Sequence, residues 1–306
     1  MAEEIVDVVI IGSGPAGLQA AVHAVRKKAS VLVVGRTEQS SIARAHVENY
    51  LCVDGVTEGS ELLRIGVAQA ERFGARLLAE DLLKVEARED LFAVETESEH
   101  FMARSIILAT GTSRKKLKVK GEKELTGRGV SYCVDCDANF FRNAKVAVVG
   151  DKSAAADGAL TLTSYAAEVH LVTHGLDVAE SLRGKLAASK VQLHESNWVK
   201  EILGENAVTG LLLEDGTTLE VEGIFVELGA KGALNLAAGL GVQMDMETFS
   251  HIDVNRRQET NIPGVYAAGD VCGQPYQMAK AVGEGCVAGW EAANYANRRK
   301  REQGQD

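Results

Sequence analysis

The chain contains few residues of several types, and each scarcity excludes a class of protein. Its 306 residues include only 3 prolines, 5 cysteines and 2 tryptophans. Five cysteines cannot form the disulfide framework of a small secreted protein, so we expect a cytoplasmic protein. No apolar run approaches the roughly 18 residues of a membrane span, so we expect no membrane partner. Basic residues are outnumbered, 33 to 43, and the net charge of −10 argues against nucleic acid or an anionic membrane as a general partner.

Two stretches repeat one pattern of a strand, a turn, a helix of small residues and a second strand. The first begins with an apolar strand at Ile5–Ile11, where acidic residues stand in place of the positive charge of a signal peptide. The second begins at Ala144 and reads AKVAVVG, then DKSAAADGALTLTSYA, then EVHLV. Repeated β-α-β units of this kind form parallel sheets. We therefore expect an α/β fold with two Rossmann-like nucleotide-binding domains, the second inserted in the first.

The length of the chain suits two domains, each large enough to bury a core. We expect residues 1–115 and 246–306 to form the first domain and residues 116–245 to form the inserted one. The segment SRKKLKVKGEK, residues 113–123, is polar and basic and is interpreted as a linker. Residues 201–229 predict a β-meander with an Asp-Gly turn, followed by one more strand.

The stretch after the first strand reads GSGPAG, which has the spacing of a dinucleotide-binding fingerprint. In such a turn Gly12 allows the tight bend, Gly14 lets the backbone approach a pyrophosphate, and Gly17 lets the helix pack on the strand. The pyrophosphate would lie at the positive end of the helix. A glycine-rich turn without a ligand is the alternative, and the flanking strand and helix favour the fingerprint. The candidate residues are Gly12, Ser13, Gly14, Pro15, Ala16 and Gly17.

Three further segments extend this candidate nucleotide site. The second strand ends in Gly35-Arg36-Thr37-Glu38, which displaces to Glu38 the acid that usually binds the ribose. The segments IILATGT, residues 106–112, and GVYAAGDV, residues 264–271, each end a strand in a small turn that contains glycine. The candidate residues after the second strand are Gly35, Arg36 and Glu38.

With these motifs the chain resembles the low-molecular-weight thioredoxin reductase family over nearly its full length. The resemblance implies that the first fingerprint binds FAD, that an A-T-G turn passes near it and that a G-D dipeptide holds it. The segment VENYLCV, residues 47–53, resembles the V-E-N-Y-P-G of the family, with Leu51-Cys52 in place of Pro-Gly. The residues implied as further flavin contacts are Asn49, Thr110, Gly111, Gly269, Asp270, Gln277, Met278 and Ala279.

The most specific part of the resemblance is GRGVSYCVDCDANFFRN, residues 127–143. Two cysteines separated by two residues at the start of a helix can cycle between dithiol and disulfide, because the helix N-terminus lowers the thiol pKa. The resemblance implies that Cys136 faces the flavin and that Cys133 attacks the substrate disulfide. Asp137 would then give a proton to, and take one from, the leaving thiolate.

A zinc site is the alternative for this cysteine pair. Structural zinc takes four ligands, and the sequence offers no second pair of cysteines. We therefore expect no bound metal. The other three cysteines, Cys52, Cys272 and Cys286, are interpreted as packing residues, and His174 as a surface histidine.

The second turn departs from the family pattern. Where relatives bind NADPH through G-x-G-x-x-A, this chain has Asp151 and Lys152 after the first glycine. Where relatives read H-R-R-x-x-x-R, residues 173–179 read THGLDVA and hold no arginine. Each lost charged hydrogen bond to the 2′-phosphate is worth about 1.5–3 kcal/mol. Loss of the arginines alone would turn NADPH preference toward NADH, but a carboxylate and a lysine side chain in the turn argue against either nicotinamide. The alternative is that Lys152 swings out and still contacts phosphate.

Electrons would then have to come from another donor. The linker holds six basic residues, which could steer an acidic carrier such as a ferredoxin or flavodoxin to the protein. A solvated charge run is the alternative interpretation, and a small carrier that reaches the flavin directly or a second flavin in the vacant site are rival routes. The six residues are Arg114, Lys115, Lys116, Lys118, Lys120 and Lys123.

The sequence thus predicts a flavin-dependent disulfide reductase that passes two electrons from FAD to the pair Cys133 and Cys136 and on to thioredoxin or a thioredoxin-like protein. Thioredoxin as partner and a homodimeric assembly are implied by the resemblance alone. Two other classes stay open. One is an ordinary NAD(P)H-dependent thioredoxin reductase, and the other is a flavin-binding redox sensor without turnover, which would have little need of Asp137.

Overall fold

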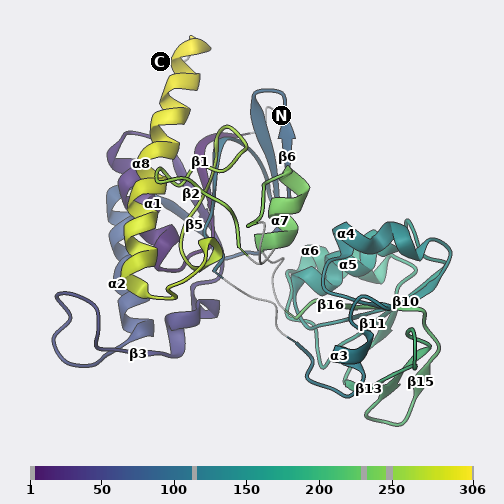
Figure 1. The fold of residues 1–306 in the computed structure, drawn as a ribbon. Coiled ribbons are helices and arrows are strands. Elements are labelled where there is room, and N and C mark those ends of the chain that lie inside the picture. Colours follow the sequence, from purple (N-terminus) through teal and green to yellow (C-terminus); the bar gives the residue numbers. More distant parts are fainter. Residues whose placement is uncertain (1–3, 112–115, 229–232, 246–250, 305–306) are drawn as a thin grey trace. The chain divides into compact units, whose positions relative to one another are not determined.

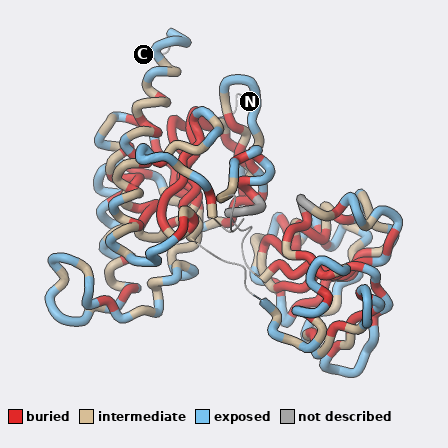
Figure 2. Tube along the Cα trace, viewed as in Figure 1, coloured by how far each residue is buried: buried red, intermediate tan, exposed pale blue. Residues whose placement is uncertain are grey.

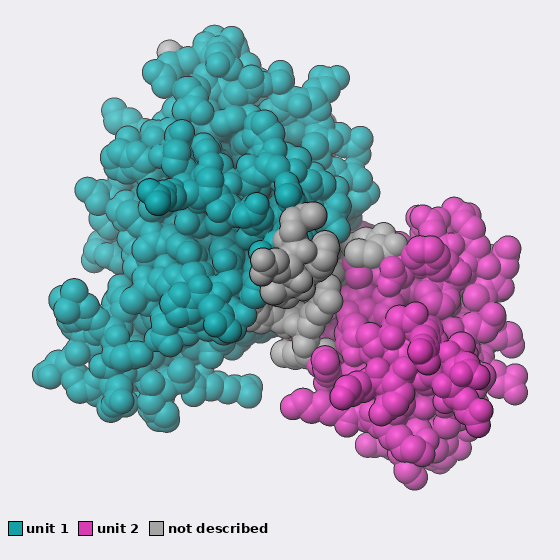
Figure 3. Space-filling model, viewed as in Figure 1, with its two compact units in different colours: residues 1–112, 236–306 teal, residues 113–235 magenta. Residues whose placement is uncertain are grey.

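In the computed structural model of the protein, residues 4–111, 116–228, 233–245 and 251–304 are described (Figure 1). The chain divides into two compact units, Met1–Thr112 with Leu236–Asp306 and, inserted between them, Ser113–Asn235 (Figure 3). Each unit contains a sheet of mainly parallel strands with helices packed on it, so the α/β fold with two Rossmann-like domains is confirmed. The second boundary lies at residue 236, ahead of the expected residue 246.

The first unit is built on a sheet with the strand order β5-β2-β1-β8-β7-β6, in which β17 also pairs with β8. Strands β5, β2, β1, β8 and β17 run parallel, whereas β6, β7 and β8 are antiparallel neighbours. The elements are β1 (Ile5–Ile11), α1 (Pro15–Arg26), β2 (Val31–Val34), η1 (Thr37–Gln39), η2 (Ser41–Arg44), β3 (His46–Val47), β4 (Thr57–Glu58), α2 (Gly59–Phe73), β5 (Arg76–Leu78), β6 (Leu82–Arg88), β7 (Leu91–Thr96), β8 (His100–Leu108), β17 (Val265–Ala267), η4 (Asp270–Cys272) and α8 (Met278–Glu302).

The register of this sheet brings three strand ends to one edge. Ile11 at the end of β1 pairs with Leu108 of β8, and Leu108 pairs with Ala267 of β17. Strand β1 is buried from Val6 to Ile11, and Asp7 is its one polar side chain. The turns that follow these strands therefore meet at the carboxyl edge, where open α/β sheets bind their ligands.

Helices α1 and α8 pack closely because glycines of α8 face the backbone of α1. A Cβ on Gly285 would lie 2.2 Å from the carbonyl oxygen of Ala16, and one on Gly289 would lie 2.2 Å from that of Ala20. Alanines from both helices complete the core under the sheet, which Figure 2 shows as a buried band through the unit. The N-terminus of α1 is thereby fixed relative to the strand that precedes it.

The second unit has a parallel sheet with the order β12-β11-β10-β16-β9 and a separate antiparallel sheet β13-β14-β15. Its elements are α3 (Glu122–Leu125), β9 (Val130–Ser131), α4 (Val134–Asp137), η3 (Ala138–Phe141), β10 (Lys145–Val149), α5 (Ser153–Leu162), β11 (Glu168–Val172), α6 (Glu180–Ala187), β12 (Gln192–His194), β13 (Val199–Leu203), β14 (Gly210–Leu213), β15 (Thr218–Leu219) and β16 (Gly223–Val226). A further helix, α7 (Ala233–Leu240), crosses the second boundary between the units.

The expected β-meander is present as β13-β14-β15, with Gly216 in the left-handed conformation at its turn. The strand after it, β16, leaves the meander and pairs in parallel with β10. That pairing places the end of β16 beside the second candidate turn. In the described parts of the chain, no helix is both long and apolar enough to cross a bilayer.

Candidate functional site

The first candidate turn is shaped by contacts that tolerate only glycine at two of its positions. Gly12 has φ +115°, and a Cβ there would lie 2.3 Å from the carbonyl oxygen of Ala109. A Cβ on Gly17 would lie 1.8 Å from the carbonyl oxygen of Gly12. Gly14 is the N-cap of α1 and offers no side-chain cap, and Pro15 begins the helix. The first backbone amides of α1 are therefore left without a capping side chain, as a phosphate site at a helix N-terminus requires.

The turn lies against residues from the ends of the neighbouring strands. The distance from a Cβ added to each glycine shows how close these segments lie. A Cβ on Gly35 would lie 3.1 Å from the amide nitrogen of Ser13, and one on Gly269 would lie 3.0 Å from the Cβ of Ala16. A Cβ on Gly14 would lie 3.2 Å from the hydroxyl of Ser40. The predicted nucleotide residues after β1, β2 and β17 are thus brought to one place.

Thr110 provides a test of whether a cofactor fits there. Its hydroxyl oxygen is buried and has no hydrogen-bond partner among the described residues. A buried hydroxyl without a partner costs about 1–3 kcal/mol. Thr110 follows Ala109 at the carboxyl edge, where Gly12 packs, and Gly111 next to it is in the left-handed conformation. The residues present therefore fit a bound nucleotide cofactor that supplies the missing partner.

Two residues predicted to contact the flavin ring also meet. The side-chain amide of Asn49 donates a hydrogen bond of 3.0 Å to the side-chain oxygen of Gln277. Gln277 is the N-cap of α8, and Met278 is the first residue of that helix. Asn49, Gln277 and Ala279 are exposed and Met278 is half-buried. Segments more than 200 residues apart in the chain (|i−j| = 228) are joined at this point.

Asp270 of the G-D dipeptide is partly buried, and this burial raises the pKa of its carboxyl group. The preceding Gly269 is held by two residues that the sequence analysis missed. Glu284 accepts a hydrogen bond of 2.8 Å from the amide of Gly269, and Lys280 donates one of 2.9 Å to its carbonyl oxygen. Lys280 and Glu284 also form an ion pair at 3.0 Å. Their i, i+4 spacing on the predicted last helix could have indicated the ion pair from the sequence.

Arg36 and Glu38 differ in their surroundings. The guanidinium of Arg36 lies 2.8 Å from a carboxylate oxygen of Asp81 and 2.6 Å from one of Glu97. Both carboxylates are buried, so Arg36 is fixed at the end of β2. Glu38 lies exposed on η1 and is available to a ribose. Sequence reasoning missed Asp81 and Glu97 because only the sheet brings them to Arg36.

The predicted redox residues lie between β9 and η3 of the second unit. Cys133 is disulfide-bonded and only 6% exposed. The hydroxyl of Ser131 donates a hydrogen bond of 2.6 Å to Oδ2 of Asp137 and accepts one of 3.1 Å from the amide of Cys133. Ser131 therefore fixes the carboxylate of Asp137 relative to Cys133. The side chain of Cys136 lies outside the described part of the structure.

A second carboxylate lies beside this segment and was missed by the sequence analysis. Glu227 follows β16, is 7% exposed, and its Oε1 accepts a hydrogen bond of 3.3 Å from the amide of Val134. Val134 is the residue directly after Cys133.

The other cysteines divide into two kinds. Burial raises the pKa of the Cys272 thiol to about 12, so this residue is an uncharged packing residue. Cys286 is also a half-buried free thiol. The packing prediction for Cys52 is wrong, because Cys52 is exposed in a loop with φ +72°. Its backbone conformation explains why the related segment has glycine there. In the described ranges, no three His, Cys, Asp or Glu side chains form a group that could hold a metal ion.

The second candidate turn keeps Gly150 and has Asp151 and Lys152 at the positions that follow. A Cβ on Gly150 would lie 2.0 Å from the carbonyl oxygen of Glu227, which requires glycine. The carboxylate of Asp151 accepts hydrogen bonds from the hydroxyl of Thr173 at 2.8 Å and from the amide of His174 at 2.9 Å. The ammonium group of Lys152 forms an ion pair with Asp177.

The loop after β11 is held in place by the same contacts. The amide of Asp177 donates a hydrogen bond of 2.8 Å to the carbonyl oxygen of Asp151. His174 is a surface residue as expected, and its ring stacks on Trp198 with 4.1 Å between ring centroids. Polar groups and an aromatic face of this turn are thus engaged by the chain itself.

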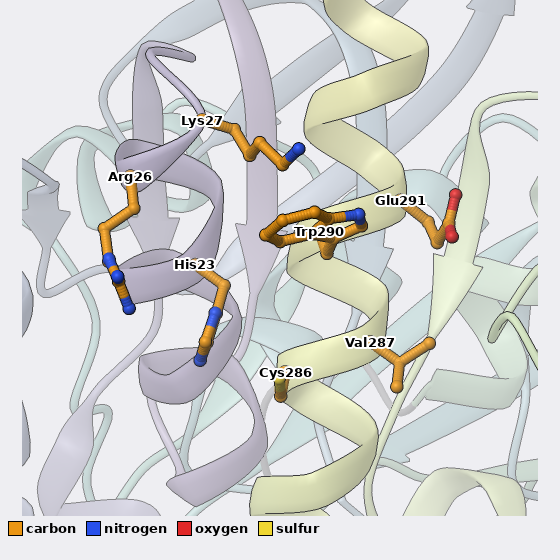
Figure 4. Close-up of a pocket in the computed structure, with 7 residues that line it drawn as sticks. All are labelled: His23, Arg26, Lys27, Cys286, Val287, Trp290 and Glu291. Carbon is orange, nitrogen blue, oxygen red and sulfur yellow. The ribbon is translucent and has the colours of Figure 1, made fainter.

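A cavity of about 560 Å³ lies elsewhere in the first unit, between α1 and α8 (Figure 4). The ammonium group of Lys27 lies 3.3 Å from the centroid of the Trp290 ring at this cavity. None of the lining residues is a site residue predicted from the sequence. They are His23, Arg26, Lys27, Cys286, Val287, Trp290 and Glu291.

Comparison with known proteins gives one family. The family model described as pyridine nucleotide-disulphide oxidoreductase matches residues 6–285. The chain is 34% identical over 312 residues to the thioredoxin reductase of Aquifex aeolicus, which covers 98% of this chain and 96% of the relative.

Two solved structures are similar over nearly the whole chain. The atypical thioredoxin reductase TRi from Desulfovibrio vulgaris Hildenborough is 36% identical, with a TM-score of 0.84, covering 95% of this chain and 98% of that one. A ferredoxin-flavin thioredoxin reductase from Clostridium acetobutylicum is 33% identical, with a TM-score of 0.70, covering 96% and 99%.

Proposed function

This chain belongs to the pyridine nucleotide-disulphide oxidoreductase family, and we propose that it reduces a thioredoxin-like disulfide with electrons that do not come from NAD(P)H. It is a thioredoxin reductase-like flavoprotein oxidoreductase. FAD is the cofactor, and the turn at Gly12–Gly17 with the orphaned hydroxyl of Thr110 fits it.

The observation that carries the proposal is the content of the second turn. Asp151 already accepts hydrogen bonds from Thr173 and His174, where a diphosphate would need free donors. A carboxylate at that place repels a diphosphate, and Lys152 is held by Asp177. The loop that carries arginines in NADPH-binding relatives is also occupied by its own contacts. These features support a site that no longer serves a nicotinamide nucleotide.

The residues of the first unit would hold the cofactor. The uncapped amides at the start of α1 would bind the pyrophosphate, and Glu38 would accept hydrogen bonds from the ribose. Asn49 and Gln277 would contact the ring system. When bound, FAD supplies an electron pair for disulfide reduction.

The residues of the second unit would carry out the thiol chemistry. The disulfide of Cys133, paired with Cys136 in this proposal, takes up two electrons and two protons to become a dithiol. The thiolate of Cys133 attacks the thioredoxin disulfide, Cys136 closes the new intramolecular disulfide, and thioredoxin leaves as a dithiol. Asp137 moves the proton at the leaving sulfur, and Ser131 orients Asp137 for this step.

Protein partners would bind near this disulfide. Phe140 lies three residues after Asp137 and is 82% exposed. An aromatic side chain held in water is costly and suits an anchor for a protein surface. This supports thioredoxin or a thioredoxin-like protein as the substrate.

The electron donor would be an acidic one-electron carrier such as a ferredoxin or flavodoxin. Lys116, Lys118 and Lys123 are exposed on a chain of net charge −10, whereas Lys120 is paired with Glu201 at 2.7 Å. Arg114 and Lys115 lie outside the described residues. Basic residues on an acidic protein can steer an acidic carrier, and the similarity to a ferredoxin-flavin thioredoxin reductase supports this donor.

The donor surface is tested by charge reversal. Lys116, Lys118 and Lys123 are changed together to Glu, and Lys28, Lys190 and Lys200, which are also exposed, serve as a control of equal charge change. We expect the first variant to slow flavin reduction by ferredoxin at low salt and the control to have little effect. Equal rates and equal salt dependence in the two variants would refute the docking surface.

We also propose a homodimer located in the cytoplasm. Leu51, Val56 and Ile65 of the first unit are exposed apolar residues, at 86%, 60% and 49%, and would be covered in a homodimer. Sedimentation of wild type and Ile65→Glu distinguishes a dimer from a monomer. The free thiols of Cys52, Cys272 and Cys286 suit the reducing cytoplasm.

The deciding experiment is an anaerobic titration of the flavoprotein with NADPH and then NADH, followed by dithionite, with the oxidised-flavin absorbance recorded. We expect dithionite alone to bleach the flavin. Rapid bleaching by either nucleotide at micromolar levels would make the protein an ordinary NAD(P)H-dependent thioredoxin reductase. A protein that forms the disulfide yet reduces no thioredoxin after dithionite or ferredoxin reduction would be a redox sensor.

A further inference from the structure

Glu227 is a buried carboxylate that the chemistry described above does not use. It directly follows β16, and its amide donates a hydrogen bond of 2.9 Å to the carbonyl oxygen of Val149 in β10. Its residue exposure is 7%, so the side chain does not point freely into solvent. A buried carboxylate is expensive to keep unless it has polar partners or a function.

The side chain lies between α4 and α5. Its Oε1 accepts the hydrogen bond from the amide of Val134, which is a residue of α4. On the other side, a Cβ added to Gly158 of α5 would lie 4.0 Å from the Cγ of Glu227 and 2.9 Å from a methyl group of Val134. Gly158 therefore leaves the room in which Glu227 and Val134 meet.

This contact reaches the peptide group that joins Cys133 to Val134. The amide on the other side of Cys133 donates its hydrogen bond to Ser131, which itself donates to Asp137. The backbone of Cys133 is thus held from both sides, by Ser131 with the carboxylate of Asp137 and by the carboxylate of Glu227. Asp137 has an assigned proton-transfer role, but Glu227 has none.

The position of Glu227 has an electrostatic consequence. A negative charge in a poorly solvated place disfavours a second negative charge nearby. The disulfide of Cys133 is neutral, whereas the reduced form includes a thiolate. An ionised carboxylate beside this backbone therefore favours the disulfide over the dithiol.

We propose that Glu227 is a positioning residue for the redox centre, which holds the Cys133–Val134 peptide and makes the disulfide of Cys133 harder to reduce. The inference rests on the proposed function, because it assigns Glu227 to the disulfide of that function. A less stable dithiol passes its electrons more completely to a thioredoxin disulfide. Glu227 therefore favours electron flow from the second unit to thioredoxin.

The test compares Glu227→Gln with a matched control. Glutamine keeps the size and an oxygen that can accept from Val134, but it lacks the charge. Glu222 precedes β16 at the opposite end of the strand, and its Oε1 accepts a hydrogen bond of 3.3 Å from the amide of Lys145. Glu222→Gln therefore makes the same chemical change at an equally long contact away from Cys133.

The holoenzymes are equilibrated without oxygen in buffers of reduced and oxidised glutathione at pH 8. In this reaction one protein disulfide and two glutathione thiols give one protein dithiol and one glutathione disulfide. The mixtures are quenched with acid and alkylated, and the Cys133 peptide is quantified by mass spectrometry. We expect Glu227→Gln to move the equilibrium about three- to fivefold toward the dithiol for a change of about one unit in thiol pKa. We expect Glu222→Gln to leave it unchanged.

A second measurement separates charge from structure. The rate at which iodoacetamide alkylates the reduced protein at pH 7 increases with the fraction of thiolate. A thiolate of lower pKa is also a weaker nucleophile, so we expect the rate to rise only about threefold in Glu227→Gln. Glu227→Asp keeps the charge and should lie nearer to wild type in both readouts. If Glu227→Gln does not accumulate as a folded protein, Glu227→Asp decides instead, since its shorter carboxylate should move the equilibrium in the same direction by a smaller factor.

The inference is overturned if Glu227→Gln shifts the equilibrium no more than Glu222→Gln does, even where its melting temperature falls. Failure of the proposed function gives a different result. In that case wild type reduces no thioredoxin after its flavin has been reduced, whereas the glutathione equilibrium at Cys133 is measured without any turnover.

Discussion

The hydroxyl of Thr173 donates a hydrogen bond of 2.8 Å to the carboxylate of Asp151, which joins the loop after β11 to the turn after β10. In a nucleotide-binding turn these two loops would both face the ligand. Here the carboxylate takes the acceptor role that a phosphate oxygen would have, and it belongs to the chain itself. This hydrogen bond is a structural contact between the two loops.

Replacing Asp151 should therefore destabilise the second unit. Asp151→Ala removes an acceptor from Thr173 and from the amide of His174, and we expect a loss of about 1–3 kcal/mol in the free energy of unfolding. Asp177→Ala breaks the ion pair with Lys152, in which Asp177 is 70% exposed, and should cost less, about 0–1 kcal/mol. Chemical denaturation of both variants measures the difference. A loss in Asp151→Ala no larger than that in Asp177→Ala would contradict the structural role.

Ser131 should matter for catalysis through Asp137. In Ser131→Ala the carboxylate of Asp137 loses its hydrogen bond of 2.6 Å, so its orientation toward the leaving sulfur is relaxed. We expect thioredoxin turnover with a chemically reduced flavin to fall about tenfold, and by about a hundredfold in Asp137→Asn. Ser131→Thr keeps the hydroxyl and should recover most of the activity. A Ser131→Ala enzyme with wild-type turnover would remove Ser131 from the mechanism.

Phe140 should affect the docking of thioredoxin and not the chemistry of the redox disulfide. We expect Phe140→Ala to lower kcat/KM for thioredoxin about 5- to 30-fold, the range for losing one aromatic anchor. Reduction of a small aromatic disulfide should be unchanged, because it needs no docking surface. Phe73→Ala, also at an exposed phenylalanine but in the first unit, is the control. Equal losses with the small disulfide and with thioredoxin would place the effect of Phe140 on the redox centre itself.

Features that depend on short spacing could be predicted from the sequence. The need for glycine at Gly12 and Gly17 follows from the fingerprint, and the structure gives its physical cause, because an added Cβ would lie within 2.5 Å of a backbone carbonyl oxygen at both positions. The neighbourhood of Cys133 and Asp137 is also local, since Asp137 ends the short helix that directly follows Cys133. In such cases the chain spacing alone sets the geometry.

Other features depend on contacts between distant segments, which the spacing of residues along the chain does not predict. Glu227 reaches Val134 from 93 positions away because β16 leaves the predicted meander and pairs with β10. Arg36 meets Glu97 across 61 positions for a similar reason. The burial expected for Cys52 was wrong because its loop exposes it, and composition carries no information on that.

The close packing of α1 and α8 leads to a paired prediction on one helix. A Cβ on Gly285 would meet the carbonyl oxygen of Ala16 at 2.2 Å, whereas one on Gly283 would have nothing within 4 Å. Gly285→Ala should therefore destabilise the protein by about 1–3 kcal/mol through overpacking. Gly283→Ala should stabilise it by about 0.5–1 kcal/mol, because alanine favours the helix. Thermal unfolding of the two variants should give shifts of opposite sign, and shifts of the same sign would contradict this packing.

A histidine pair in the second unit should make stability depend on pH. Nδ1 of His170 lies 3.0 Å from Nε2 of His194, and burial lowers the pKa of both imidazoles. His194 lowers the pKa of His170 further, while Glu168 and Asp215 raise the pKa of their respective neighbours by a smaller amount.

Proton binding determines whether the stability rises or falls with pH. The unfolded chain binds protons at these histidines near pH 6.5, the ordinary pKa, whereas the folded chain binds them only at lower pH, so folding loses stability as the pH falls below about 6.5. We expect the melting temperature of wild type to fall between pH 7 and pH 5.5, and the fall to be smaller in the double variant His170→Gln and His194→Gln. His100→Gln, at an exposed histidine of the first unit, should keep the wild-type profile. If the double variant shows the same loss as wild type, the acid sensitivity arises from other groups, such as His23, whose pKa is also lowered by burial.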